Sequence, residues 1–399
     1  MEFTGSYENS HPWITFELNM KKAHPRVWIL IGKAMRGCRA HIGSAADPLF
    51  AERALNRRLA EAVRANAAME GLSLPPEEID EILSMNPSEL NELIKDIRVS
   101  GRVESGREGE KVFLINIVRL YLFLLEQVSR VRDNPDTDTG GISGINQILY
   151  KGVETGAAIS PGSFRKGALE IHGYTGVNPR ECEYLLDRLT RGLAESRESF
   201  PAGDEFASGL IRAFIAHRYI TWILPFDIGN ALTARFTELQ VMLSAGVPAE
   251  AAISLSSYYS RTHAQYRDYL YGGMKESVFD FMEYCLRGFV KGIAELNDRL
   301  ELSREGAVWG QYLDRVFENE RDEIAGRRKK LVLGILKYGD RVTPRQVRYV
   351  TPEVTLCYEG RSDKTLTRDI TSLVEQGILR REGRKIGVDR NIIFPFRDR

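Results

Sequence analysis

Apolar positions along most of the chain follow the spacing of amphipathic helices. Near the N-terminus four of them fall at i, i+3, i+4 and i+7: Val27, Leu30, Ile31 and Ala34. Further helices are expected over residues 47–70, 114–131, 179–196, 206–222 and 230–245, with two more between about 261 and 304. Gly71 follows the first of these, at a position where glycine commonly ends a helix. The pattern predicts a mainly α body.

Two segments of the body depart from the helical spacing. Residues 168–171 show an alternating pattern with glycines on both sides, which predicts a small β-hairpin. Residues 133–144, with the sequence DNPDTDTGGISG, are rich in turn-forming residues and predict a loop.

The last part of the sequence has its own order of elements. Helices are expected over residues 329–338 and 363–375, with a second segment over 343–357 between them. Ser362 is a good N-cap for the third of these, and Gly377 a good end. Two β-prone runs, 378–381 and 391–394, follow on either side of a basic turn. Three helices and a basic hairpin in this order are typical of a winged helix-turn-helix domain.

Charge is distributed unevenly over the 399 residues, although 55 basic and 55 acidic residues balance in the whole chain. Residues 324–399 contain 18 Lys and Arg against 9 Asp and Glu, a net charge of +9. The rest of the chain therefore carries a net charge of −9. We expect only the basic part to meet a polyanion such as DNA.

Candidate DNA contacts fall in two groups. Lys364 and Arg368 are four residues apart and share one face of the predicted recognition helix. The predicted hairpin adds a cluster of four cations: Arg380, Arg381, Arg384 and Lys385. Cations that neutralise phosphates give an affinity that depends on salt and not on base sequence. A winged helix that serves only for protein contacts is the alternative.

Composition and missing motifs exclude several classes of protein. The 43% hydrophobic and 28% charged residues are typical of globular chains. The four cysteines are far apart, which argues against a disulfide framework or a zinc site and for reduced thiols in the cytoplasm. The sequence has no signal-peptide pattern at its start and no run of about 18 apolar residues, so we expect a cytoplasmic protein without a membrane span. The common nucleotide-loop, zinc-protease, hydrolase and calcium motifs do not occur.

The chemistry is suggested by residues 224–235, which join two predicted helices and have the sequence LPFDIGNALTAR. This stretch resembles the signature of the Fic family, His-Pro-Phe-x-(Asp/Glu)-Gly-Asn-Gly-Arg-x-x-Arg. Members of that family mostly transfer AMP from ATP to a protein hydroxyl. The flanking sequences AHRYITWI and LQVMLSAGVP resemble the family as well. The resemblance implies a Fic-type helical core, with ATP and Mg²⁺ as cofactors.

An N-terminal segment carries the same resemblance. NAAMEGLSLPPEEI, from Asn66, resembles the inhibitory Ser/Thr-x-x-x-Glu-Gly segment of many Fic proteins. Glu70 and Gly71 of the segment 66–71 match it, and Asn66 takes the Ser/Thr place.

The segment 161–174, which begins PGSFR, resembles the flap on which the family positions its protein targets. It supplies three flap residues: Gly162, Phe164 and Arg165. The resemblance thus implies four regions and a homodimer. The regions are an N-terminal helical region over 1–110, a Fic core over 111–300, a connecting helix over 301–326 and a winged helix over 327–399.

Several departures from the family signature affect catalysis. Leu224 stands where the family has its general-base His, and such a base typically contributes about 10²–10⁴ in rate. Ile228 stands where an acidic residue helps to hold Mg²⁺, and the neighbouring Asp227 is a poor substitute in an octahedral shell. Leu232 replaces the first phosphate-binding arginine. We therefore expect impaired catalysis and no metal site made by the protein.

Other positions of the signature remain. Gly229 and Asn230 begin a helix, whose free N–H groups and dipole favour an anion. Arg235 matches the arginine that holds the terminal phosphate in the family, and Glu70 matches the inhibitory residue that pairs with it. The alternatives are a plain N-cap for Asn230, an interhelical ion pair for Arg235 and a solvated helix end for Glu70. His217 lies two helical turns, about 10 Å, before the loop, so we expect it in a helix interface and not as a base.

Three functions follow, in this order of preference. The first is a degenerate Fic protein that acts as a bacterial-type, nucleotide-responsive and DNA-binding regulator. The second is an active nucleotidyl or phosphoryl transferase with altered chemistry, which uses Asp227, Asn230 and Arg235. The third is a non-catalytic scaffold that binds a peptide.

Overall fold

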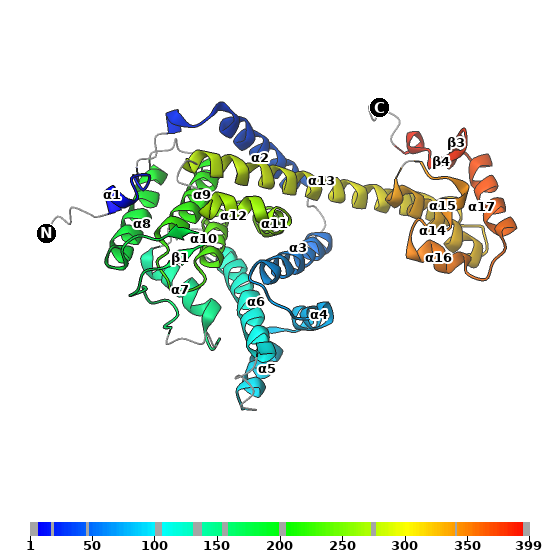
Figure 1. Ribbon diagram of the computed structural model, residues 1–399. Helices are drawn as coiled ribbons and strands as arrows, with labels where there is room; N and C mark the ends of the chain where they lie inside the picture. The colour runs from blue at the N-terminus through cyan, green and yellow to red at the C-terminus, as the bar shows by residue number, and fades with distance from the viewer. Residues whose placement is uncertain are drawn as a thin grey trace. The chain divides into compact units, whose positions relative to one another are not determined.

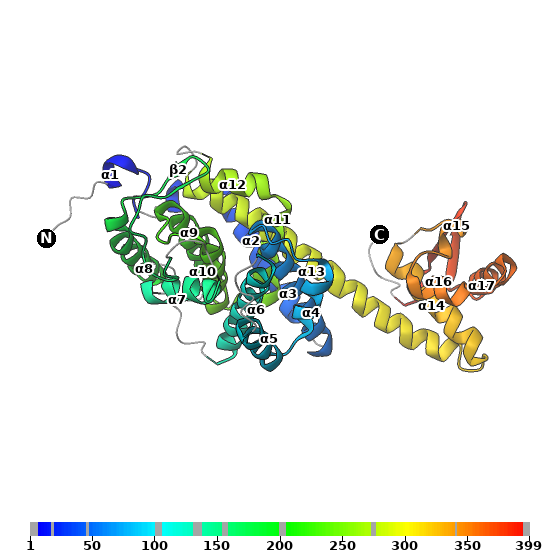
Figure 2. The same ribbon diagram turned by 60° about the horizontal axis from the view of Figure 1, so that its bottom comes forward.

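The computed structural model describes residues 7–16, 20–44, 48–99, 106–130, 138–153, 159–198, 205–272, 277–339 and 341–393. Over these residues the chain is mainly helical with two small antiparallel hairpins, so the predicted fold class is confirmed (Figures 1 and 2). The chain divides into two compact units, Met1–Asn297 and Asp298–Arg399. Within the described ranges, each helix is too short or too polar to span a lipid bilayer.

The first unit is built almost entirely from helices. They are α1 (Tyr7–Ser10), α2 (Pro25–Ser44), α3 (Pro48–Met69), α4 (Pro76–Ser84), α5 (Pro87–Val99), α6 (Gly106–Arg130), α7 (Thr139–Tyr150), α8 (Cys182–Glu198), α9 (Glu205–Ile223), α10 (Asn230–Ser244), α11 (Ala249–Arg261), α12 (His263–Tyr271) and the start of α13 (Val278–Val316). The predicted hairpin consists of β1 (Glu170–Ile171) and β2 (Tyr174–Thr175), with Glu170 opposite Thr175.

Helices α9 and α10 form the centre of this unit, and they pack against each other. Every residue of α9 from Ala207 to Ile223 is buried, as are most residues of α10. A helix that is enclosed on all sides must be apolar around its whole circumference or have its polar groups paired. The loop between these two helices is therefore held by a rigid support.

Two parts of the helical prediction for this unit were wrong. Residues 133–137 of the loop expected over 133–144 lie outside the described residues. Residues 139–144 belong to α7, which begins at Thr139 because the Asp138 carboxylate accepts a hydrogen bond from the Gly141 N–H at 2.7 Å. Helices α5 and α11 were not predicted. In α11 the sequence AEAAISLSSYYSR mixes small, polar and aromatic residues on its buried side. Its buried serines hide the apolar spacing.

The second unit has its own apolar core, which includes Trp309, Leu331, Ile335 and Leu373. Its elements after α13 are α14 (Asp322–Tyr338), α15 (Pro344–Val347), α16 (Pro352–Tyr358), α17 (Asp363–Glu375), β3 (Leu379–Glu382) and β4 (Lys385–Val388). The bounds of α17 agree with the prediction.

The hairpin of the second unit is tighter than expected. Glu382 pairs with Lys385, so only Gly383 and Arg384 form the turn, and Gly383 has φ +62°. The second strand is therefore 385–388, within the predicted turn, and the predicted strand at 391–394 is wrong over its described residues, where Arg390–Ile392 is a 3₁₀ turn.

Candidate anion-binding site and basic face

The loop Leu224–Gly229, called here the α9–α10 loop, begins with an unusual backbone conformation. Leu224 is fully buried and has φ +50°, a left-handed conformation that costs a non-glycine residue about 1–2 kcal/mol. Its N–H donates to the Ile220 carbonyl at 2.9 Å, and its carbonyl accepts from Arg165 Nε at 2.6 Å. Hydrogen bonds on both sides thus hold Leu224 in this conformation.

The hairpin segment 161–176 caps the end of α9. The guanidinium of Arg165 is buried and donates to the carbonyls of Leu224, Gly167 and Val177. The Tyr174 hydroxyl donates to the Trp222 carbonyl at 2.7 Å. The last carbonyls of a helix lack partners within it, so these two side chains satisfy groups that would otherwise be buried without a hydrogen bond. Sequence analysis identified Arg165 only as a flap residue and missed this role.

The same segment also pairs directly with the α9–α10 loop. Phe164 and Phe226 form a β-bridge, their rings stack with centroids 6.0 Å apart, and the Arg165 N–H donates to the Pro225 carbonyl at 3.0 Å. The Asn146 side chain, another residue that the sequence did not single out, accepts from the Gly162 N–H at 2.8 Å and donates to the Ile228 carbonyl at 3.0 Å. Phe164 and Arg165 thus contact the α9–α10 loop directly, and Gly162 is connected to it through Asn146.

The start of α10 requires a glycine and a closed loop. Gly229 has φ +71°, and a Cβ there would lie 2.1 Å from the Tyr150 ring. The Asn230 side chain is buried and exchanges two hydrogen bonds with the Phe226 backbone, at 2.7 and 2.9 Å. Gly229 is therefore the N-cap residue, and Asn230 closes the loop instead. The first backbone bond of the helix is donated by the Thr233 N–H, so the N–H groups of residues 230–232 precede it.

The positions that differ from the Fic signature are mostly apolar and enclosed. Leu224 and Leu232 are fully buried, Ile228 is half-buried, and Asp227 is exposed. Among the described residues no group of three or more His, Cys, Asp and Glu side chains could hold a metal ion. Mg²⁺ prefers oxygen ligands, and the apolar side chain of Ile228 offers none at the position of the acidic residue in the signature.

Arg235 and Glu70 form an ion pair, although they are 165 positions apart in the sequence. The side chain of Arg235 is 4% exposed and that of Glu70 is 18% exposed. Arg235 also donates to the Tyr266 hydroxyl at 3.4 Å, while its buried Nε atom has no partner among the residues that the structure describes. Burial opposes the charged form, but Tyr266 and Glu70 outweigh it and raise the pKa of the guanidinium. The site thus holds a buried cation with hydrogen-bonding capacity left over, which fits a phosphate group.

Glu70 is positioned by the end of α3. Its N–H donates to the Asn66 carbonyl at 3.0 Å, and Gly71 turns the chain with φ +75°. Asn66 is fully buried and donates from Nδ2 to the Tyr121 hydroxyl at 2.7 Å. The ion pair predicted between Glu70 and Arg235 is thus formed, and the solvated position for Glu70 does not apply.

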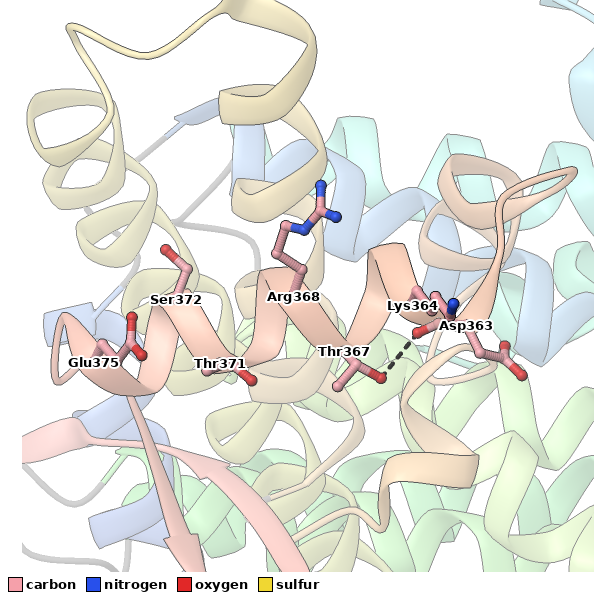
Figure 3. A pocket seen from close by; sticks show the side chains of 7 residues that line it. All are labelled: Asp363, Lys364, Thr367, Arg368, Thr371, Ser372 and Glu375. Atoms are coloured by element: carbon pink, nitrogen blue, oxygen red, sulfur yellow. Dashed lines mark hydrogen bonds between the residues drawn. The ribbon is translucent and has the colours of Figure 1, made fainter.

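The predicted DNA contacts of the second unit are all exposed: Lys364, Arg368, Arg380, Arg381, Arg384 and Lys385. Arg380 pairs with Glu382 at 3.3 Å, whereas the other five have no ion pair with any residue that the structure describes. Figure 3 shows that Lys364, Thr367, Arg368 and Thr371 line a pocket along α17, and that Arg368 extends away from the helix axis.

A buried network holds α17 in place. Asp369, next to Arg368, accepts from Arg327 Nε at 2.7 Å and from the Tyr358 hydroxyl at 2.9 Å. Burial would raise the pKa of the Asp369 carboxyl, but these hydrogen bonds and the charge of Arg327 outweigh burial and lower it. The carboxylate therefore stays ionised and connects α14, α16 and α17.

Comparison with known proteins gives matches among solved structures only. The chain matches no protein-family model and no curated protein. It is similar to a Fic family protein from Desulfovibrio desulfuricans, with 15% identity, coverage of 92% of this chain and 97% of the other, and a TM-score of 0.43. It is also similar to Fic-1 (residues 134–508) from C. elegans, with 18% identity, 70% and 75% coverage and a TM-score of 0.43. A Fic domain containing signaling protein from Bacteroides thetaiotaomicron has 12% identity, 69% and 97% coverage and a TM-score of 0.46.

Proposed function

We propose that this chain is a Fic-type protein that lacks the catalytic base and acts as a nucleotide-responsive, DNA-binding regulator. The observation that carries the proposal is the ion pair between Glu70 and Arg235. These residues stand at the positions of the inhibitory glutamate and of the phosphate-binding arginine in the resemblance.

The ligand that fits the site is a nucleoside triphosphate. Its terminal phosphate takes the place of the Glu70 carboxylate on Arg235, which keeps its buried Nε available. The N–H groups at the start of α10 and the helix dipole supply a second source of positive potential. Any Mg²⁺ is bound through the nucleotide, because Ile228 offers no oxygen ligand.

A transfer reaction has less support. The residue at the position of the general base is Leu224, which is buried and cannot accept a proton. Among the residues that the alternative transferase would use, Asp227 is exposed and Asn230 already binds the Phe226 backbone. A peptide-binding scaffold also has less support, because the flap is already paired with the α9–α10 loop at Phe164 and Phe226.

The DNA-binding part of the proposal is supported by the second unit. Five exposed cations that form no ion pair with the described part of the chain lie on α17 and the β3–β4 hairpin. Such cations keep their full charge for an external anion, and duplex DNA presents phosphates on both sides of its grooves. The order of helices and hairpin also favours this interpretation.

The nucleotide part is tested by calorimetric titration with ATP and Mg²⁺. Removing Glu70 frees Arg235 from a hydrogen bond between charged groups, so Glu70→Gly is expected to bind ATP about 10-fold tighter or more. Glu77→Gln on α4, which removes an exposed charge nearby in sequence, is the matched control and should bind like the wild type. Arg235→Ala should not bind. If neither the wild type nor Glu70→Gly binds ATP, the nucleotide part is wrong.

The transferase alternative is tested by mass spectrometry of Glu70→Gly after incubation with ATP and Mg²⁺ or Mn²⁺. We expect no adduct on the protein or on lysate proteins under conditions in which an active Fic enzyme labels its target. Stoichiometric labelling would show that the protein is a transferase, and the proposal of a regulator without catalysis would be wrong.

A further inference from the structure

We propose that His217 and Glu238 are positioning residues for Arg235 and that they act through the hydroxyl of Tyr266. The inference rests on the proposed function in one respect, since Arg235 is the cation of the proposed anion site. It assigns a role to His217 and Glu238, two buried polar residues that the site itself does not use.

The three residues form a chain of hydrogen bonds that ends at Arg235. The Tyr266 hydroxyl lies 3.4 Å from an Arg235 Nη atom and 2.8 Å from His217 Nε2. His217 Nδ1 lies 2.5 Å from a Glu238 carboxylate oxygen. His217, Tyr266 and Glu238 are 0%, 2% and 3% exposed. This chain of hydrogen bonds therefore links α9, α10 and α12 in the buried interior.

Donors and acceptors in this chain fit one arrangement of protons. The Tyr266 oxygen accepts from Arg235, so its single hydrogen is free to donate to His217 Nε2. His217 then carries its proton on Nδ1 and donates it to Glu238. The Tyr259 hydroxyl donates to the same carboxylate at 2.9 Å. Because the donor or acceptor role of each group depends on that of its neighbour, this chain of hydrogen bonds fixes the direction of the Tyr266 hydroxyl.

This direction matters because Arg235 has few other contacts. Its hydrogen bonds with described residues go to Glu70 and Tyr266, and its Nε has none. When an anion displaces Glu70, Tyr266 is the contact that remains to orient the guanidinium. Burial raises the pKa of Tyr266, so the hydroxyl stays neutral beside the cation.

The charge state of His217 follows from its surroundings. Burial lowers its pKa, while Glu238 on α10 raises it, and Arg235 and Arg218 lower it further. Tyr259 on α11 and Tyr266 on α12 face the ring edge-on, and Phe281 on α13 lies against it at 5.1 Å. A protonated His217 would present Nε2–H to the Tyr266 oxygen and add a second cation beside Arg235. Protonation is therefore expected to weaken the orientation of Arg235.

The first experiment needs no ligand. Urea unfolding is followed for the wild type, Glu70→Gln, Tyr266→Phe and the double variant. If Tyr266 orients Arg235 toward Glu70, the loss in midpoint caused by Glu70→Gln shrinks by more than half in the Tyr266→Phe background. Tyr284→Phe is the matched control, because Tyr284 is buried and its hydroxyl binds Thr262 at 2.6 Å, outside the chain. An equal loss in all three backgrounds overturns the proposal.

If Tyr266→Phe fails to fold, the same double-variant cycle is carried out with Glu238→Gln in its place. His217→Gln, which can still accept from Tyr266, is expected to keep most of the coupling, whereas His217→Leu loses it. A purely structural role predicts that the two substitutions change the coupling to the same extent.

The second experiment is the pH profile of ATP affinity in Glu70→Gly, with and without His217→Gln. As pH falls through the lowered pKa of His217, which lies below 6.5, the affinity of Glu70→Gly is expected to fall several-fold more steeply than that of the double variant. Protonation of ATP itself affects both proteins equally. Parallel profiles overturn the proposal. If ATP does not bind at all, the proposed nucleotide site fails, and the urea cycle still decides whether the chain positions Arg235.

Discussion

Arg235 in the first unit and Arg368 in the second differ in the properties that determine how an arginine binds an anion. Arg235 is buried, pairs with Glu70 and touches Tyr266. Arg368 is exposed on α17, and no ion pair joins it to any residue within the described ranges. The two side chains carry the same charge, yet only one of them must give up a partner before it can bind a ligand.

The difference predicts two kinds of binding. A buried cation is little screened by salt, and its affinity for a ligand is set by competition with its internal partner. Exposed cations act additively, and their contribution decreases as salt rises. The first unit is therefore suited to a switch and the second to a graded, electrostatic contact.

The largest expected effect is on stability. Arg235→Ala leaves Glu70 and Tyr266 without their partner, so we expect the first unit to lose about 3 kcal/mol in free energy of unfolding. Arg368→Ala removes an exposed charge and should change the second unit by no more than about 0.5 kcal/mol. Urea unfolding of both variants measures the contrast. Equal losses would mean that burial does not distinguish the two arginines.

Two glycines give a matched comparison of backbone strain. Gly229→Ala adds a left-handed alanine and a clash with Tyr150, so the loss should be about 2 kcal/mol or more. Gly383 has a similar φ, but a Cβ there meets nothing within 4 Å, so Gly383→Ala should lose only about 1 kcal/mol. Thermal or urea unfolding of each unit checks the order. A larger loss at Gly383 would contradict the packing described around the α9–α10 loop.

Dependence of stability on pH should also separate the units. Burial lowers the pKa of His217 below 6.5, so the unfolded chain takes up a proton first as pH falls. Stability of the first unit should therefore decrease below about pH 6.5, by up to about 1.4 kcal/mol per pH unit, until the folded pKa is reached. The second unit contains no histidine and should stay constant over pH 5.5–7.5. His217→Gln should flatten the profile of the first unit; an unchanged slope would assign the effect to another group.

The smallest effects are those of single exposed cations. Arg368→Ala and Arg384→Ala should each lower the slope of log affinity for duplex DNA against log salt concentration by about 1. Lys337→Ala, on the exposed side of α14, is the matched control and should leave the slope unchanged. Fluorescence anisotropy at several salt concentrations measures the slopes. Equal changes in all three variants would indicate a nonspecific response to net charge.

Local sequence signals predicted more of the second unit than of the first. In the second unit the bounds of α17 and the exposure of its cations followed from local signals, such as Ser362 and the i, i+4 spacing of Lys364 and Arg368. In the first unit the partnership of Glu70 and Arg235 came from resemblance, because no local rule relates residues so far apart.

The residues that position the α9–α10 loop were not predicted from the sequence. Arg165 and Asn146 bind backbone carbonyls and N–H groups of distant segments, and such contacts leave no periodic pattern in the sequence. The alternative of a plain N-cap for Asn230 was wrong, because a side chain that closes a loop and one that caps a helix occur at the same sequence position. Long-range polar contacts are thus the part that needed the structure.

The most direct test of the whole account measures the affinity of Glu70→Gly for a duplex DNA with and without ATP at fixed salt. A nucleotide-responsive regulator predicts that ATP changes the dissociation constant about 5-fold or more, as coupled sites typically do, and that Arg235→Ala abolishes the change. An unchanged dissociation constant at an ATP concentration that saturates the protein would contradict the account.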